Sequence, residues 1–424
     1  MKYNDVIKEC SKLLPYVIWG EVNIDQRKIG CLTFGINEPI NFLGENIYKF
    51  DSTINNIWNN KDKSVYYLLR KDIENYVIKI IKTLKKNGES ATQNNIDLKK
   101  QWEELINKKI YNYYVTFPIY GVVINEPVQL GLFSAYNSSD YGKFVVENFN
   151  IPREQVVQLS LLKKELNYLV INSVEAKNSQ RAIELARPYF ELFESVAKFC
   201  LYGDDRFDVG IFNYNAHHSE EGYAFKKPIS SETYGRFASS SKSKGAFQPL
   251  PLKELSSSET MFLWEIVSRY IKGQTTELEN RLVNAIRWIG IANSNQSEAT
   301  QYVQYVFALE SLLAYNPQND PITPSISAQL AEYAAFIVGE NANEKVISKG
   351  ELRKKIFKDV KKIYANRSKV VHGSDIRINN ATISGVRETI YIIVHSVAYN
   401  KEILKMTSMN ELARWIEDLK FLIH

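Results

Sequence analysis

The sequence of 424 residues has few cysteines, glycines and prolines, and it contains no long apolar run. Its three cysteines, Cys10, Cys31 and Cys200, lie far apart, so they provide neither a disulfide framework nor the spacing of a zinc site. With 19 glycines and 12 prolines, long disordered or collagen-like segments are not expected. No apolar stretch approaches the roughly 20 residues that a membrane-spanning helix needs. The absences predict a soluble protein of the reducing cytoplasm, without a membrane partner.

The first ten residues, MKYNDVIKEC, carry acids and lack an apolar core, so we expect no secretory signal. The sequence also offers no recognisable cofactor site. His217 and His218 with Glu220 and Glu221 are conceivable metal ligands, but adjacent residues rarely reach one ion, and a polar loop is the favoured interpretation. His395, within an apolar helical segment, is expected to be a core histidine.

The charge of the chain is unevenly distributed. The formal net charge is only +5. From Lys345 to Arg377, however, eleven basic residues face three acidic ones, which gives +8 there and leaves −3 for the rest of the chain. A local field of this size attracts a polyanion such as RNA. A solvated helix face without a ligand is the alternative explanation.

Residues 1–245 mix strand and helix patterns, so we expect a mixed α/β region that senses or positions something. Aromatic and β-branched residues broken by glycine and proline predict strands, and apolar residues at helical spacing predict helices. The expected strands are 16–22, 28–35, 46–50 and 206–215, with a hairpin over 111–136 that turns at 125–127, and the expected helices are 63–86, 153–167 and 179–201.

Residues 246–424 show helical patterns throughout. The segment 230–245, rich in serine and glycine, is the expected linker before them. Short connections between helices predict an antiparallel bundle, and Ser256–Glu259 is a candidate capping box at its start. The predicted fold class is therefore α+β. The expected helices are 258–272, 276–293, 297–315, 325–339, 344–371, 381–400 and 409–423.

Two charged side chains fall on helix faces where apolar residues are expected. At 100° per residue, Arg367 lies about 20° from Ile356, on the apolar face of its helix. Glu310 likewise lies among the apolar residues of 301–313. Because a guanidinium or a carboxylate is costly to bury alone, we expect the two to form a buried pair. Such a pair either fixes only the register of two helices or positions the arginine for a further role.

His372 follows Arg367 by five residues and precedes Gly373, a natural helix stop. On an ideal helix the two side chains would point about 140° apart. They converge on one phosphate only if the helix distorts there or if a second copy of the chain completes the site.

The segments Ala308–Leu313 (ALESLL) and Ile363–Gly373 (IYANRSKVVHG) resemble the HEPN superfamily, and most of all its Apea-like branch. The signature of that family is an arginine, four to six intervening residues and then a histidine, here Arg367 and His372 with four residues between them. The end of a bundle helix, the upstream Leu-Glu-x-Leu-Leu segment and the glycine after the histidine make the match specific. The resemblance covers about residues 255–424.

The resemblance implies a metal-independent endoribonuclease that acts as a homodimer through its carboxy-terminal bundle. Many members are toxins or antiphage abortive-infection effectors that cut RNA, often tRNA, so a phage-derived activator or an antidote is a further expected partner. The neutral imidazole of His372 would take the proton of the RNA 2′-OH, which leaves a 2′,3′-cyclic phosphate, and Arg367 would hold the phosphate.

Auxiliary residues complete the expected site. Ser368 stands where the family has a polar residue after the arginine, and Glu310 is the expected partner of that arginine. The basic residues expected to contact the RNA backbone are Lys361, Lys362, Lys369 and Arg377. Two alternatives stay open: a catalytically inactive HEPN-like module that only binds RNA or protein, and an enzymatic function in residues 1–245.

Overall fold

The computed structural model describes residues 1–22, 30–35, 38–58, 63–149, 151, 166–201, 206–212, 218–226, 236–241, 248–295, 297–315, 325–341, 347–371 and 378–421. Two compact units are present. The first contains Met1–Val115, Asn172–Ala186 and Gly222–Phe237, and the second contains Thr116–Ile171, Arg187–Glu221 and Ala238–His424. A mixed α/β region precedes an all-helical one, which confirms the predicted α+β class. The domain boundary expected at residue 245 falls outside the described residues and stays a prediction.

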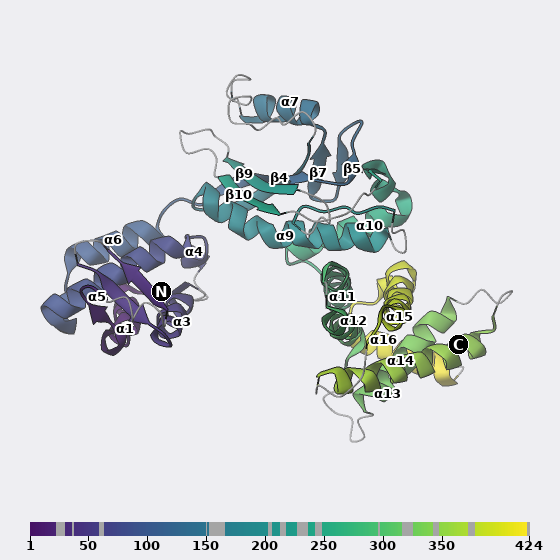
Figure 1. Ribbon diagram of the computed structural model, residues 1–424. Helices are drawn as coiled ribbons and strands as arrows, with labels where there is room; N and C mark the ends of the chain where they lie inside the picture. Colours follow the sequence, from purple (N-terminus) through teal and green to yellow (C-terminus); the bar gives the residue numbers. More distant parts are fainter. Residues whose placement is uncertain are drawn as a thin grey trace. The chain divides into compact units, whose positions relative to one another are not determined.

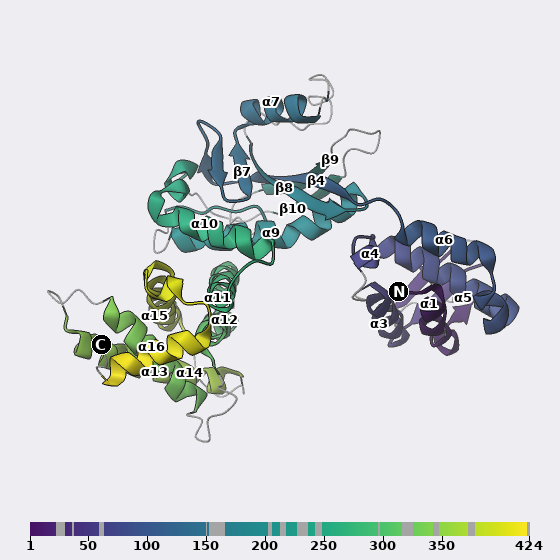
Figure 2. The same cartoon turned by 180° about the vertical axis from the view of Figure 1, so that it is seen from behind.

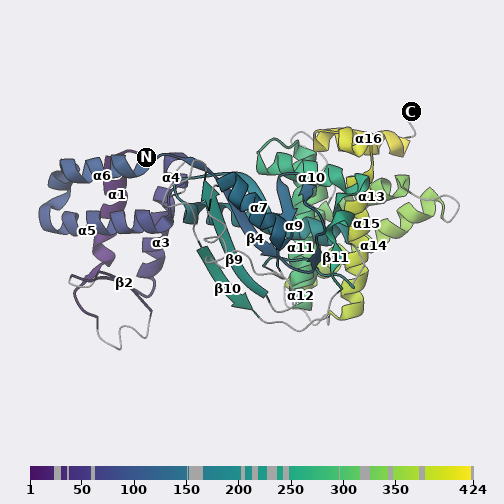
Figure 3. The same cartoon turned by 90° about the horizontal axis from the view of Figure 1, so that it is seen from above.

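The first unit combines helices with a small antiparallel sheet (Figure 3). Strand β3 lies between β1 and β2, and all four of its residues are buried. The rings of Phe34, Phe42 and Phe50 have centroids 4.7 to 6.4 Å apart, so sheet and helix share an aromatic core. The elements that lie wholly in this unit are α1 (Tyr3–Ser11), η1 (Leu14–Tyr16), β1 (Ile18–Trp19), β2 (Cys31–Phe34), β3 (Ile40–Leu43), α3 (Asn46–Trp58), α4 (Lys63–Tyr66), α5 (Arg70–Gln93) and α6 (Ile96–Ile106).

A six-stranded sheet has the strand order β10-β9-β4-β8-β7-β6. Strands β4 (Tyr111–Ile119), β8 (Asn167–Ala176), β9 (His218–Lys226) and β10 (Arg236–Ser241), like helix α9 (Ser179–Cys200), have residues in both units. Strands β6 (Val128–Leu130) and β7 (Phe133–Tyr136) form a tight antiparallel hairpin. The remaining elements before the helical region are β5 (Val122–Val123), α7 (Ser138–Phe149) and β11 (Leu250–Pro251), of which β5 and β11 pair in parallel.

In the second unit, helix α9 lies along one face of the sheet (Figure 1), and aromatic side chains make the contact. The ring of Phe190 lies 4.9 Å from that of Phe117 and 5.9 Å from that of Phe133. Further along α9, Phe193 stacks on Trp264 at 5.0 Å. Sheet, α9 and the first helix of the bundle therefore share one apolar core in this unit.

The helical region consists of successive helices (Figures 1 and 2). Helix α11 packs on α12, α13 packs on α14, and α15 contacts α12, α13 and α14. None of the helices in the described ranges combines the length and apolarity needed to cross a membrane. The elements are η2 (Leu252–Ser256), α10 (Ser258–Ile271), α11 (Glu277–Ser294), α12 (Glu298–Leu313), α13 (Ile326–Glu340), α14 (Lys349–Val371), α15 (Asn380–Tyr399), η3 (Ile403–Lys405) and α16 (Met409–Phe421).

Several predictions for the amino-terminal half were wrong. The expected strand 46–50 is the start of α3, because Phe50, Ile54 and Ile57 at helical spacing supply its buried face. The expected linker 230–245 contains strand β10, and 206–212 makes isolated bridges rather than a strand. The expected hairpin turn at 125–127 lies between β5 and β6, which do not pair with each other in the described part of the chain: β6 lies beside β7, and β5 pairs with β11.

Two further expectations need correction. Helix α5 was expected to stop before Gly88, but a helical segment continues to Gln93 after a kink at that glycine, whose φ is 75°. No capping box opens α10, because its N-cap Ser257 makes no side-chain cap hydrogen bond. A capping box does open α11, where Thr276 and Glu279 exchange hydrogen bonds. The expected helix 153–167 lies mostly outside the described residues.

Candidate functional site

Helix α14 carries the apolar stripe that the sequence predicted. Ile356, Val360 and Ile363 are buried, and the hydroxyl of Tyr302 on α12 donates a hydrogen bond of 2.8 Å to the Ile363 carbonyl. Burial raises the pKa of Tyr302 to about 12, although a hydrogen bond with Asn366 acts in the opposite direction. The phenol therefore remains a donor at neutral pH and ties the last turns of α14 to α12.

Arg367 continues this stripe one turn beyond Ile363 and faces Glu310 on α12, as predicted. Its Nε lies 3.8 Å from Glu310 Oε1, and the two side chains are 31% and 23% exposed. The pair is therefore half-buried rather than buried. Nε itself is shielded from solvent and has no hydrogen-bond partner among the described residues. At 3.8 Å the carboxylate attracts the guanidinium without a hydrogen bond, so the donors of Arg367 are not used up.

Aromatic groups surround this pair. The guanidinium carbon of Arg367 lies 5.8 Å from the ring centre of Phe307, at the outer limit of a cation–π contact. Burial and the Glu310 carboxylate raise the pKa of Tyr364, while the Arg367 charge lowers it. Tyr364 therefore stays neutral and leaves the site with one carboxylate and one guanidinium.

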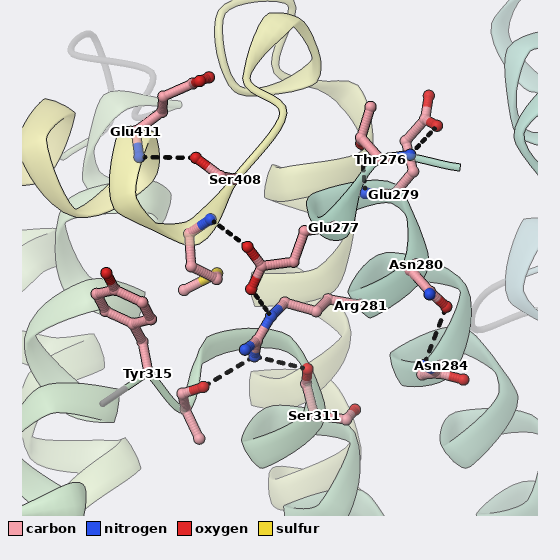
Figure 4. A network of polar contacts seen from close by, with 12 residues as sticks. Thr276, Glu277, Glu279, Asn280, Arg281, Asn284, Ser311, Tyr315, Ser408 and Glu411 are labelled. Atoms are coloured by element: carbon pink, nitrogen blue, oxygen red, sulfur yellow. Dashed lines mark hydrogen bonds and ion pairs between the residues drawn. The ribbon is translucent and has the colours of Figure 1, made fainter. Parts of the chain in front are cut away.

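The position of Glu310 is set by the end of α12. The Glu310 carbonyl accepts a hydrogen bond of 2.9 Å from the N–H of Ala314, which closes the helix. Arg281 on α11 donates to the carbonyls of Ser311 at 3.4 Å and Ala314 at 2.8 Å, and to the carboxylate of Glu277 at 3.0 Å. Figure 4 shows Arg281 reaching from α11 to this helix end. A cation at a helix C-terminus satisfies its free carbonyls, so this network stabilises the turn that carries Glu310.

The outer faces of α14 are strongly basic. The helix carries nine basic residues and two acidic ones. Two of the bases, Lys349 and Arg353, pair with Glu340 on α13. Lys361, Lys362 and Lys369 are exposed, as expected for residues that contact a polyanion, and so is Ser368.

Two of the predicted site residues, His372 and Arg377, lie outside the described residues. The expected convergence of Arg367 and His372, and the expected second copy of the chain, therefore stay predictions. One further expectation is wrong. His395 was expected in the core but is exposed on α15, where it stacks on Tyr399 at 4.2 Å. Over the described ranges, no group of three or more histidine, cysteine or acidic side chains gathers as a metal site would require.

The structure adds a groove that the sequence analysis missed. It has a volume of about 450 Å³ and lies between α14 and α15. Lys355, Lys362 and Asn366 line it from α14, and Thr382 and Glu388 line it from α15. The three α14 residues are seven and four positions apart, which places them on one helix face. That spacing was visible in the sequence, but the facing residues of α15 were not.

Comparison with known proteins leaves the family open. No model of a protein family matches the chain. No curated protein matches it, and no solved structure does. The residues and their geometry therefore carry the functional argument.

Proposed function

We propose that the helical region is a metal-independent endoribonuclease that binds RNA along α14 and cleaves it with Arg367 and His372. The observation that carries the proposal is the burial of the Arg367 guanidinium together with its lack of a hydrogen-bond partner among the described residues. This guanidinium is half-buried on an apolar stripe, held by a carboxylate at 3.8 Å, and makes no hydrogen bond to the described residues. Placing a charge there is costly, and an anion that the guanidinium binds would offset this cost.

The reaction needs a base and a cation, because RNA carries its own nucleophile. His372, five residues after Arg367 in the sequence, takes the proton of the 2′-OH. The 2′-oxygen then bonds to the adjacent phosphorus and the bond to the 5′-oxygen breaks, which leaves a 2′,3′-cyclic phosphate. The 5′-oxygen departs as a hydroxyl after taking a proton. Arg367 stabilises the charge that develops on the non-bridging oxygens.

The surrounding residues have supporting roles in this proposal. Glu310 holds the guanidinium in place, and Ser368 follows it on the exposed side of α14. Lys361, Lys362 and Lys369 attract the RNA backbone, together with Arg377. A second copy of the chain, bound through the bundle, would bring two such motifs together. Cleavage of a cellular RNA such as tRNA would then arrest growth, which suits a toxin or an abortive-infection effector.

Sequencing of RNA ends after brief expression tests the proposal. The wild type is expected to generate new 5′-hydroxyl and 2′,3′-cyclic phosphate ends at defined positions, and purified protein is expected to do so in the presence of EDTA. His372→Ala should abolish these ends because the base is lost. His395→Ala is the matched control, since it removes an exposed histidine elsewhere in the bundle and should cleave like the wild type.

The opposite results are equally clear. New ends that His372→Ala generates as efficiently as the wild type would assign the cleavage to another part of the chain. RNA that co-purifies with the protein but carries no new ends would indicate a catalytically inactive RNA-binding module instead.

A further inference from the structure

The groove between α14 and α15 combines an apolar floor with charged and polar edges. Ile356 and Ile363 of α14 and Val386 of α15 contribute to the floor, and Ile392 is 37% exposed at its edge. An exposed isoleucine beside a hollow leaves apolar surface available to a flat ligand. The volume of about 450 Å³ lies in the range of roughly 300–1,000 Å³ typical of sites for small molecules.

The charge of one edge favours an anionic chain. Lys355 and Lys362 line the groove from α14 and are exposed. Neither lysine forms an ion pair with another residue in the described part of the chain. Lys354, Lys358 and Lys361 continue the basic surface beside the groove. Phosphates that follow α14 would therefore pass directly along this edge.

The acidic residues in the groove disfavour the binding of inorganic phosphate. Asp359 and Glu388 face the same space from the two helices, and they would repel an inorganic phosphate. Carboxylates accept hydrogen bonds from the amino groups of nucleobases, as acidic side chains do when they bind the N4 amino group of cytosine. Thr382, Thr389 and Asn366 add further hydrogen-bonding groups.

We propose that this groove binds a base of single-stranded RNA, while the neighbouring lysines hold its backbone, and that it prefers bases with an exocyclic amino group. The inference rests on the proposed function, because it places the substrate on the helix that carries Arg367. Asn366 lines the groove and is the residue immediately before Arg367. The groove would thus set which nucleotide lies next to the scissile phosphate.

Gly385 on α15 provides a selective test. It lines the groove, is exposed, and an added Cβ would meet no atom within 4 Å. The Cβ of Gly385→Phe therefore meets no atom within 4 Å, and its ring is expected to occupy part of the groove. Gly350 on α14 is the matched control, because it is exposed, also has open space around an added Cβ, and does not line the groove. Gly385→Ala leaves most of the groove open and serves as a second control of folding.

The experiment measures the Kd of a short 2′-O-methyl oligonucleotide, which lacks the attacking hydroxyl and cannot be cleaved by this chemistry. Gly385→Phe is expected to weaken binding about 10-fold, because the ring would displace the bound base from the groove. Gly350→Phe and Gly385→Ala should bind like the wild type, and thermal melting checks their folding. The wild type should also bind oligo(C) about 5-fold more tightly than oligo(U), since uracil has no exocyclic amino group.

Three results would overturn the inference, and they are distinguishable. If the wild type binds and cleaves RNA but Gly385→Phe binds equally well, the groove proposal fails and the proposed function stands. If Gly385→Phe changes only the oligomeric state, the groove is an interface between copies of the chain. If the wild type neither binds the oligonucleotide nor generates new RNA ends, the proposed function fails and the groove proposal with it.

Discussion

At each end of α14 an arginine faces a glutamate and an aromatic ring of a neighbouring helix, but the two arrangements differ. Near its start, Arg353 Nη2 donates a hydrogen bond of 2.5 Å to Glu340 on α13, which also accepts one of 2.9 Å from Lys349. Near its end, Arg367 Nε lies 3.8 Å from Glu310 on α12 and makes no hydrogen bond to it. One pair is closed by direct contacts, and the other is held at a distance.

The two arginines also differ in their packing, and Arg353 again has the closer contacts. The guanidinium of Arg353 lies 4.3 Å from the ring centre of Phe336, and a Cβ on Gly339 would come within 2.5 Å of Arg353 Cγ. The side of Arg353 that faces α13 is therefore closely packed. Arg367 lies 5.8 Å from Phe307. Nε of both arginines is buried without a hydrogen-bond partner among the described residues, so they differ in the rest of the guanidinium. Arg353 donates a hydrogen bond through Nη2 and stabilises the fold, whereas Arg367 makes none to the described residues and has the capacity to bind an anion.

The largest expected effect is a loss of RNA cleavage without a loss of stability when Arg367 is replaced. Arg367→Ala should lower the rate of RNA cleavage by at least about 100-fold, because one group that stabilises developing charge contributes roughly that much. Its melting temperature should stay near that of the wild type, since an ion pair without a hydrogen bond contributes less than about 1 kcal/mol. Single-turnover cleavage and thermal melting measure the two effects.

Arg353→Ala is the matched control and should show the opposite pattern. Loss of its hydrogen bond and ring contact should lower the free energy of unfolding by about 1–3 kcal/mol. Cleavage measured well below the melting temperature should remain within about twofold of the wild type. Equal loss of activity in both variants would show that α14 acts only as a scaffold.

The smaller second effect concerns acid stability at the start of α14. Burial alone would raise the pKa of Glu340, but hydrogen bonds from Lys349 and Arg353 outweigh it, so the pKa lies below 4.5. The resulting stabilisation is present above the pKa of the unfolded chain and is lost as the pH falls through the lower pKa of the folded state. The melting temperature of the wild type should therefore drop between pH 5 and pH 3 by about 2–4 °C more than that of Glu340→Gln.

Glu310→Gln serves as the comparison for that measurement. Its carboxylate makes no hydrogen bond with Arg367, so the substitution should leave the acid dependence of melting close to that of the wild type. An acid dependence that Glu310→Gln reduces as strongly as Glu340→Gln would mean that the two pairs are equally tight in solution.

The pairing of Arg367 with Glu310 could be predicted from the sequence because the position of each residue depends on its own helix, whereas the role of His372 stays a prediction. Counting 100° per residue placed Arg367 on the apolar stripe and Glu310 on the facing helix, and the structure brings the two together. Helix geometry could not tell how tightly they pair. The groove depends on residues of α15 that face α14, so no pattern within a single helix could reveal it.

The fold was predictable in its helical half for the same reason. The seven helices expected after residue 258 are all present, and the bounds of most agree within two residues. Strand β10, RFASSS, lacks the apolar alternation of a half-buried strand and was interpreted as a linker. Sheet pairing is non-local, so pairing with its neighbour β9 decides the structure of β10 rather than its own sequence.

The smallest expected effect compares the two aromatic contacts by double-mutant cycles. Arg353→Ala and Phe336→Leu, made singly and together, should show a coupling of about 0.5–1 kcal/mol, because the guanidinium lies 4.3 Å from the ring. The matched cycle of Arg367→Ala and Phe307→Leu should show a coupling near zero, since 5.8 Å is the limit of such contacts. Urea unfolding measures both. A coupling of Arg367 with Phe307 as large as that of Arg353 with Phe336 would mean that the ring holds the guanidinium, and that the end of α14 is as rigid as its start.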